Sequence, residues 1–238
     1  MTSETAAPIP TMLLDGQAVP VLPGDTIYDV AQRQGQFLPT LCYDPRLKPF
    51  GACRLCIVEI KGVRNPVPAC TSHAAPGLEV TTNSPHLDAI RKTLLEMVAS
   101  ENREIDVSPL SGLASQELAV LIDHYQARTG RFVGVHSGHS RLDDENPFLL
   151  RDYDQCISCY RCVRVCSEQE GDHAISVMGR GFHTQIVTEF DGWLRDSACT
   201  SCGQCVQTCP TGALGDKKAL RFAEAEVKPV VVGIGADE

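Results

Sequence analysis

The alternation of apolar and polar residues near the start of the chain predicts a small sheet. Two short apolar stretches, Thr11–Leu14 and Gln17–Val21, flank the pair Asp15-Gly16, which is a strong signal for a hairpin turn. Three later stretches, bounded by turn residues, have the composition of strands: Leu55–Ile60, Val63–Val67 and Leu78–Thr82. The first third of the chain is therefore expected to fold around a β-sheet.

Apolar residues at helical spacing add one helix to this region. Asp25 is placed to cap a helix through Ile27, Val30 and Ala31, and Gly35 is placed to end it. One helix lying across a sheet makes a small α+β domain.

The middle of the chain predicts two helices. Ser84-Pro85 combines an N-cap residue with proline at the first helical position, and a helix over 86–100 follows it. A second helix is predicted over 117–128, between Ser115 and Gly130. The polar, glycine-containing segment 131–147 is expected to be a loop. These features indicate a helical connector.

Composition limits where the protein works and what it binds. The chain has 238 residues, 12 cysteines and a net charge of −9, so a basic nucleic-acid-binding face is not expected. It has no apolar run near the ~18–20 residues that a membrane-spanning helix needs. Its N-terminus lacks a secretion signal, so a cytoplasmic location is expected. In a reducing cytosol, clustered cysteines are more often metal or cluster ligands than disulfides.

The last third contains two cysteine runs of the same spacing. In each run, three cysteines at two-residue gaps are followed by a fourth after three residues, and in two-cluster ferredoxins this fourth cysteine binds the other cluster. The first 4Fe–4S cluster is therefore assigned to Cys156, Cys159, Cys162 and Cys209, and the second to Cys199, Cys202, Cys205 and Cys166. Pro210 follows the second run, as in bacterial ferredoxins, whereas Ser167 follows the first. Zinc is the alternative occupant, but it usually draws its cysteines from two separated pairs.

The first third contains a third set of four cysteines, namely Cys42, Cys53, Cys56 and Cys70. The gap of ten residues after Cys42 differs from the four-residue gap of plant-type ferredoxins. This block resembles the 2Fe–2S domain at the start of the large peripheral subunit of respiratory complex I, and related domains occur in NAD-linked hydrogenases and formate dehydrogenases. A zinc site formed by the same four cysteines is again the alternative.

The later segments sharpen this resemblance. The segments 152–166, 176–182, 199–205 and 210–214 look like the electron-input region of the formate dehydrogenase alpha subunit. The resemblance covers about residues 11–220 and implies an α+β architecture: a β-grasp 2Fe–2S domain over 11–83, a helical connector over 84–150, a two-cluster 4Fe–4S ferredoxin-like domain over 151–220, and a tail over 221–238. In that family a molybdenum- or tungsten-pterin catalytic domain follows. Because this chain stops at Glu238, that domain is expected on a separate polypeptide.

The resemblance implies an electron-transfer subunit with no catalytic residues of its own. It would relay electrons between a flavin/NAD-binding diaphorase-type subunit and a molybdenum/tungsten-pterin or nickel–iron catalytic subunit, with the formate dehydrogenase type placed first. The alternatives are the diaphorase small subunit of an NAD-linked hydrogenase and a free ferredoxin-like carrier. No nucleotide-binding motif is present.

One 2Fe–2S and two 4Fe–4S clusters are expected, and no more. Complex I relatives carry a further 4Fe–4S cluster in a box of one His and three Cys after the first connector helix. The matching stretch here, 103–116, contains neither residue type. Arg54, Arg161 and Arg164 lie beside ligand cysteines, where they either raise cluster potentials or pair with acidic residues.

Overall fold

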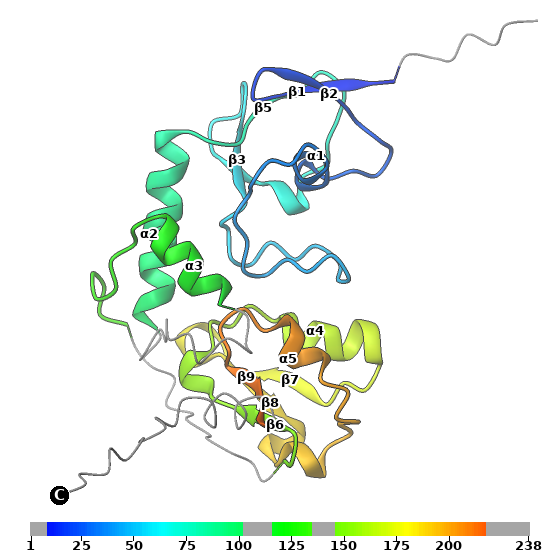
Figure 1. Cartoon of the computed structure of the whole chain (residues 1–238), viewed down its shortest axis with the longest axis vertical. Coiled ribbons are helices and arrows are strands. Elements are labelled where there is room, and N and C mark those ends of the chain that lie inside the picture. Colours follow the sequence, from blue (N-terminus) through cyan, green and yellow to red (C-terminus); the bar gives the residue numbers. More distant parts are fainter. Residues whose placement is uncertain (1–8, 102–115, 135–145, 218–238) are drawn as a thin grey trace, which may run out of the picture.

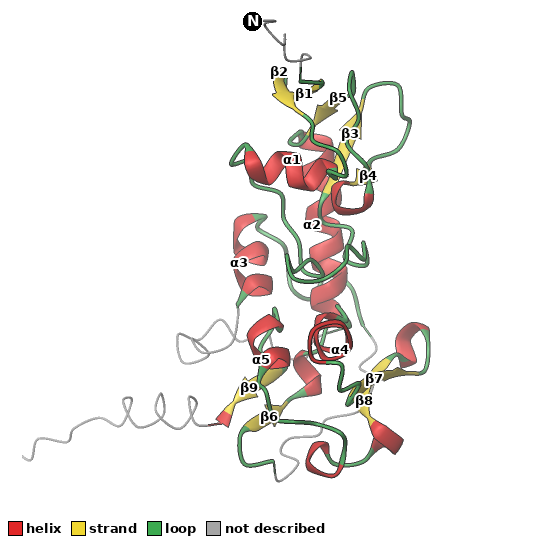
Figure 2. Ribbon diagram, turned by 90° about the vertical axis from the view of Figure 1, so that its right-hand side faces the viewer, coloured by secondary structure: helices red, strands yellow, loops and turns green. Residues whose placement is uncertain are grey.

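The computed structural model describes residues 9–101, 116–134 and 146–217. Figure 1 shows an N-terminal part built on a sheet, a pair of helices beside it, and a C-terminal part of short helices and hairpins. After a turn of the view, Figure 2 shows the same three parts stacked along the long axis. Within these described residues, the structure has no helix that is both long and apolar enough to cross a membrane.

The N-terminal part is a five-stranded sheet with one helix packed against it, which is the predicted β-grasp arrangement. The strands are β1 (Thr11–Leu14), β2 (Gln17–Pro20), β3 (Ile57–Ile60), β4 (Val67–Pro68) and β5 (Glu79–Thr81). Their order is β2-β1-β5-β3-β4, with β1 and β5 parallel and the other neighbours antiparallel. Helix α1 (Ile27–Arg33) buries Ile27, Val30 and Ala31 against Met12, Leu14 and Val58.

Several predicted boundaries in this part were wrong. The N-cap of α1 is Thr26, which forms a capping box with Asp29, whereas Asp25 accepts a hydrogen bond from Leu22 and pairs with Arg33. Strand β3 begins at Ile57, two residues later than expected. The strand predicted over 63–67 is absent except for its last residue, because the segment before Pro68 turns instead of extending.

Two helices form the connector. Helix α2 (Pro85–Ser100) begins as predicted, with the Ser84 hydroxyl accepting a hydrogen bond from the Leu87 amide. Helix α3 (Glu117–His124) ends four residues earlier than expected, at the turn before Gln126, whose φ is +49°. Buried leucines of both helices pack against the N-terminal part in one cluster: Leu41, Leu55, Leu95, Leu118 and Leu121.

A buried arginine ties α2 to the sheet. Arg91 is 2% exposed and donates hydrogen bonds to the carbonyl oxygens of Leu55, Ile57 and Thr82. It therefore satisfies backbone acceptors at the beginning of β3 and just after β5, and it fixes the direction in which the connector leaves the sheet. The stretch 103–116, expected to lack the His–Cys box, lies outside the described residues except for Gln116.

The C-terminal part consists of two separate two-stranded antiparallel sheets and two short helices. Strand β6 (Leu149–Arg151) pairs with β9 (Leu214–Asp216), and β7 (Ile175–Met178) pairs with β8 (Gln185–Thr188). Helices α4 (Arg161–Val165) and α5 (Gln204–Thr208) lie against each other. Single 3-10 turns complete the described chain at Ala69–Thr71, Tyr153–Gln155, Gly181–His183, Glu189–Asp191 and Leu194–Asp196, with a π-helical turn at Cys166–Glu170.

Candidate iron–sulfur sites

The first cysteine set lies on the rim of the β-grasp sheet, in two close pairs. The sulfur atoms of Cys42 and Cys53 are 3.4 Å apart. The Cys42 sulfur accepts a hydrogen bond from the Cys53 amide, and the Cys53 sulfur accepts one from the Leu41 amide. Cys56, directly before β3, pairs with Cys70 in the 3-10 turn that follows β4. Cys42, Cys56 and Cys70 are buried, and Cys53 is half-buried. All four predicted ligands of this set are therefore brought together.

The pairing has a chemical consequence. The hydrogen bond with Cys53 is the main cause that lowers the pKa of Cys42 to about 6, and the bond with Cys70 lowers the pKa of Cys56 in the same way. The same two hydrogen bonds raise the pKa of Cys53 and of Cys70, so each pair shares one proton between two close sulfur atoms. A 2Fe–2S cluster takes two protein ligands on each iron, so two close sulfur pairs suit it.

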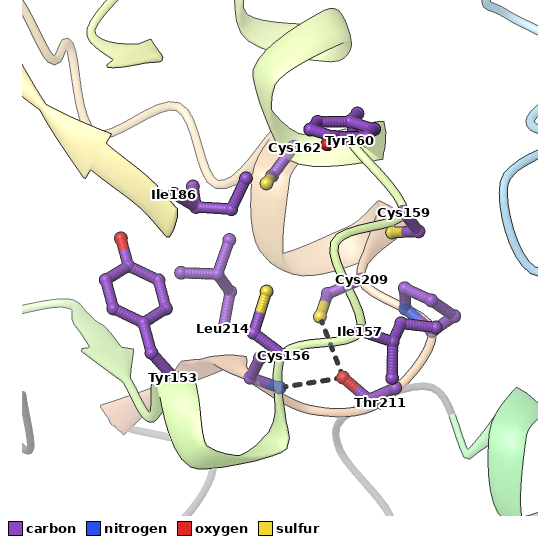
Figure 3. Close-up of a pocket in the computed structure, with 12 residues that line it drawn as sticks. Tyr153, Cys156, Ile157, Cys159, Tyr160, Cys162, Ile186, Cys209, Thr211 and Leu214 are labelled. Carbon is purple, nitrogen blue, oxygen red and sulfur yellow. Dashed lines mark hydrogen bonds between the residues drawn. The ribbon is translucent and has the colours of Figure 1, made fainter. Parts of the chain in front are cut away.

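The second set surrounds a hollow in the C-terminal part (Figure 3). Cys156, Cys159 and Cys162 come from the first run and Cys209 from the end of α5, and their sulfur atoms point toward a common space. Tyr153, Ile186 and Leu214 line the rest of this hollow. The fourth cysteine of the second run thus joins the first three of the first run, which supports the predicted exchange of ligands.

Burial makes these thiols poor acids in the absence of a cation. It raises the pKa of Cys156 to about 11 and that of Cys159 to about 12. A coordinating metal deprotonates such thiols outright, so this buried hollow suits an iron-containing group.

The third set lies nearer the surface. Cys166 and Cys205 are buried, Cys199 is half-buried, and Cys202 is exposed. Burial raises the pKa of Cys205 to about 12, and the charges of Cys199, Cys202 and Cys166 add to this shift. Cys166 therefore lies among the cysteines of the second run, the reciprocal of the arrangement around Cys209.

Local backbone geometry explains how each run presents its cysteines. Ser158 and Tyr160 adopt left-handed conformations in the first run, and Ser201 and Gly203 do so at the corresponding positions of the second. Each left-handed residue reverses the direction of the chain between two cysteines. The helix that follows then ends at the fourth cysteine and carries it away from its own loop.

Two buried arginines provide a test of whether an anionic cluster fits. The Nε of Arg161 and the Nη1 of Arg164 are buried and have no hydrogen-bond partner among the described residues. Buried donors normally find an acceptor, and the sulfur atoms of a cluster accept such bonds. Both arginines also form ion pairs, Arg161 with Glu117 and Arg164 with Glu168.

Within the same described ranges, no group of three or more His, Cys, Asp or Glu converges as a site for a single metal ion.

Sequence reasoning missed the loop between Cys42 and Cys53. This loop reaches the C-terminal part, where Asp44 accepts a hydrogen bond from Thr208, and Arg164 donates to the Lys48 carbonyl and lies over the Phe50 ring. The unusual ten-residue gap was the available signal, since a loop of that length between two ligands needs a contact to order it.

Comparison with known proteins matches two separate regions of the chain. Residues 10–85 match a family described as a 2Fe–2S iron–sulfur cluster binding domain. Residues 146–215 match the ferredoxin-like domain of NADH-quinone oxidoreductase subunit 3. Taken with the cysteine geometry, these matches define an iron–sulfur electron-transfer protein with 2Fe–2S and 4Fe–4S binding domains.

Whole-chain relatives give the family. A chain in the crystal structure of an NAD+-reducing [NiFe]-hydrogenase in its H2-reduced state is 32% identical, with a TM-score of 0.78 and 87% of each chain covered. The chain belongs to the iron–sulfur protein family that this hydrogenase chain represents.

Longer relatives contain the same region. The chain is 37% identical to a subunit of the NADH-quinone oxidoreductase of Rhizobium meliloti over 84% of its length. It is 35% identical to a subunit of the NADP-reducing hydrogenase of Solidesulfovibrio fructosivorans over 92% of its length. It spans only 23% and 38% of those two proteins.

Proposed function

We propose that this chain relays single electrons between a flavin/NAD(H) module and a separate catalytic subunit in the cytoplasm. The observation that carries the proposal is the succession of three cysteine sets in one chain, with Cys53 of the first and Cys159 of the second lining the same hollow. Iron–sulfur clusters supply one-electron redox chemistry, which can connect two-electron reactions at a flavin and at a metal centre.

Each cysteine set has its own role in this proposal. Cys42, Cys53, Cys56 and Cys70 would bind the 2Fe–2S cluster, and the two exchanged sets of the C-terminal part would each bind a 4Fe–4S cluster. The protein contributes buried thiolate ligands, arginine donors and a shell that limits water. Because Cys202 is exposed, the second 4Fe–4S site is the one nearest to a partner's surface.

Two kinds of catalytic subunit are candidates for the partner of this chain. The resemblance of the C-terminal segments to the formate dehydrogenase alpha subunit favours a molybdenum- or tungsten-pterin partner. The whole-chain likeness to a chain of the NAD+-reducing [NiFe]-hydrogenase favours a nickel–iron partner. Purification of the native complex, followed by identification of its subunits and metals, separates the two. Isolation of the chain alone from gently lysed cells, with every cluster intact, would favour the free carrier instead.

A cluster count tests the proposal on the chain itself. Anaerobically purified protein should contain about ten irons and a matching amount of acid-labile sulfide, as expected for one 2Fe–2S and two 4Fe–4S clusters. Its reduced form should show both kinds of paramagnetic signal. About fourteen irons would reveal a third cubane that the cysteine pattern does not provide for. One bound zinc per cysteine set, without sulfide, would contradict the electron-transfer proposal.

Activity assays test whether catalysis takes place on a separate subunit. The cluster-loaded chain alone should not reduce a viologen dye with formate, hydrogen or NADH as donor. Turnover with any one of these would show that the chain contains a catalytic site and would contradict the relay.

A further inference from the structure

The contact between the two cluster-binding parts is polar and buried. Asp44, two residues after Cys42, accepts hydrogen bonds from Arg46 Nε at 3.0 Å and Nη2 at 2.8 Å. The same carboxylate accepts a bond from the Thr208 hydroxyl at 2.7 Å, and Thr208 directly precedes Cys209. Asp44 is 7% exposed and Thr208 is 2% exposed, so the bond between them is shielded from water. The contact therefore joins the backbone beside a 2Fe–2S ligand to the backbone beside a 4Fe–4S ligand.

Arg161 extends this contact to the connector. Its guanidinium donates to both carboxylate oxygens of Glu117 on α3, at 2.9 and 2.8 Å, and to the Thr208 carbonyl at 3.2 Å. Arg161 is 4% exposed and lies between the ligands Cys159 and Cys162 in the sequence. All three parts of the protein therefore meet at one hydrogen-bonded group, formed by Asp44, Thr208, Arg161 and Glu117, which we call the junction.

Arg161 is linked to both ligand sets. Arg161 lies between Cys159 and Cys162 in the sequence, and its buried Nε has no hydrogen-bond partner among the described residues. Through the Thr208 carbonyl it is also linked to the residue whose hydroxyl donates to Asp44, two positions after Cys42. A buried guanidinium costs desolvation energy, and it is tolerated where carboxylates or other anionic groups surround it. Here the carboxylate of Glu117 accepts two of its hydrogen bonds, and ligand cysteines precede and follow it in the chain.

We propose that the junction holds the 2Fe–2S site and the first 4Fe–4S site at a fixed separation, and that Arg161 is the positioning residue whose bond to Thr208 supports this contact and whose charge stabilises the reduced form of both clusters. This inference rests on the proposed electron-transfer function. The Asp44–Thr208 bond fixes the distance, and the shared positive charge of Arg161 makes each cluster easier to reduce. Both effects arise at the junction, so one group of residues sets the driving force and the separation for the transfer of one electron between the two sites.

Redox titration of the anaerobically purified full chain tests the charge. Arg161→Gln should shift the reduction equilibria of the 2Fe–2S and first 4Fe–4S clusters about tenfold toward the oxidised forms, about 59 mV lower for each one-electron couple. Arg161→Lys keeps the charge and should recover most of this shift. Arg33→Gln removes the same charge from the Asp25 ion pair on α1 and serves as the control, with no change in either potential.

Two results would overturn the shared charge. One is a shift confined to the 4Fe–4S cluster, and the other is no shift at all in Arg161→Gln protein that keeps its full iron content. If Arg161→Gln loses iron, Glu117→Gln decides the question in its place. Removal of that carboxylate should raise both potentials, and a rise in only one or in neither would contradict the proposal.

Thr208→Val tests the fixed separation, because it removes the hydroxyl bonded to Asp44 and leaves every cysteine in place. A reduced 4Fe–4S cluster speeds the relaxation of a nearby reduced 2Fe–2S cluster, an effect that falls steeply with distance. We expect the 2Fe–2S signal of the variant to relax several-fold more slowly than that of the wild type, with both potentials unchanged. Thr93→Val, which removes a hydroxyl from α2 outside the junction, should relax as the wild type does.

The spectrum of the wild-type chain shows whether a failure concerns this inference or the proposed function. If the wild-type chain lacks the two kinds of cluster signal, the electron-transfer proposal itself fails. If the wild type shows both signals but Thr208→Val relaxes at the wild-type rate, the electron-transfer proposal stands and the fixed separation is wrong.

Discussion

The two cysteine runs of the C-terminal part have nearly the same backbone and very different surroundings. In both runs, left-handed residues precede a five-residue helix that ends at the fourth cysteine. The first run has Tyr160 and Arg161 where the second has Gly203 and Gln204, and the Tyr160 ring packs against Phe50 in the loop that follows Cys42. The second run contacts the same loop through polar bonds, between Thr208 and Asp44 and between Arg46 and Gln204, and it leaves Cys202 exposed. The repeat therefore determines how cysteines are presented, and the residues between them determine what each site faces.

The runs also differ after the fourth cysteine. Pro210 stops the second helix, because it has no N–H to continue it. After Cys166, Ser167 allows the chain to continue as a π-helical turn to Glu170, which Gly171 ends in a left-handed conformation. That extra turn places Glu168 beside Arg164 and the Lys48 amide. Because serine follows Cys166 where proline follows Cys209, the chain can form the turn whose Glu168 contacts Lys48 of the N-terminal part.

The largest effect is expected from the exchanged cysteines. Cys209→Ser should remove the cluster held by Cys156, Cys159 and Cys162, because Cys209 lines their hollow and serine oxygen is a poor substitute for a soft thiolate. Cys166→Ser should damage the other cluster instead. Iron content and low-temperature paramagnetic resonance of the two variants measure this. Loss of the cluster in the same run as the mutation would mean that each run binds its own cluster.

A second substitution compares the runs with the N-terminal site. Cys42→Ser should abolish the 2Fe–2S signal and leave both 4Fe–4S signals, because its ligand set lies in the separate core around the five-stranded sheet. The spectrum of the reduced variant measures this outcome. If all three signals disappeared together, the parts would not fold or assemble independently.

A smaller effect is expected where the second run has glycine. Gly203 has a φ of +77°, and Ala in that conformation costs about 1–2 kcal/mol, although open space surrounds the position. Gly203→Ala should lower the free energy of unfolding by about that amount in anaerobic denaturant titrations. The matched control is Gly62→Ala, because Gly62 has a φ of +85° and is also surrounded by open space. Gly134→Ala is not a matched control, because a Cβ there meets the Ser100 backbone. Equal stability of Gly203→Ala and the wild type would contradict the strained-turn argument.

The smallest effect concerns the first run alone. Phe50 is half-exposed and lies 5.5 Å from the Tyr160 ring and 5.2 Å from the Arg164 guanidinium. Phe50→Ala should destabilise the protein by about 1 kcal/mol through the loss of these contacts. Phe37→Ala, which removes an exposed ring from the surface near His124, is the comparison. A Phe50→Ala protein as stable as the wild type would show that the loop contact depends on its polar bonds.

Much of the fold followed from local patterns, and the errors share a cause. The hairpin at Asp15-Gly16 and the start of α2 at Ser84-Pro85 depend on turn and cap residues that act over a few positions. The early end of α3 and the late start of β3 depend on packing and on the cysteine loop, which no short window contains. Cysteine spacing predicted which thiols meet, including the exchange around Cys209, because the spacing itself carries the geometry.

The junction could not be predicted in the same way. Asp44 and Thr208 are separated by 164 positions, and neither belongs to a recognisable motif. Arg161 attracted attention only as a neighbour of cysteines, without any indication that it contacts Glu117. Contacts of this kind arise from the packing of separately folded parts, so they became visible only in three dimensions.

The ligand exchange between the runs has a consequence for how the protein is made. A ribosome completes the four cysteines of the N-terminal set by Cys70, long before Cys209 is synthesised. In the proposed assignment, neither 4Fe–4S site has all its ligands until the second run is synthesised, because Cys205 completes the second set and Cys209 the first. With the proposed ligand sets, the 2Fe–2S site can therefore mature on a nascent chain, whereas both cubanes are inserted late and close together in time.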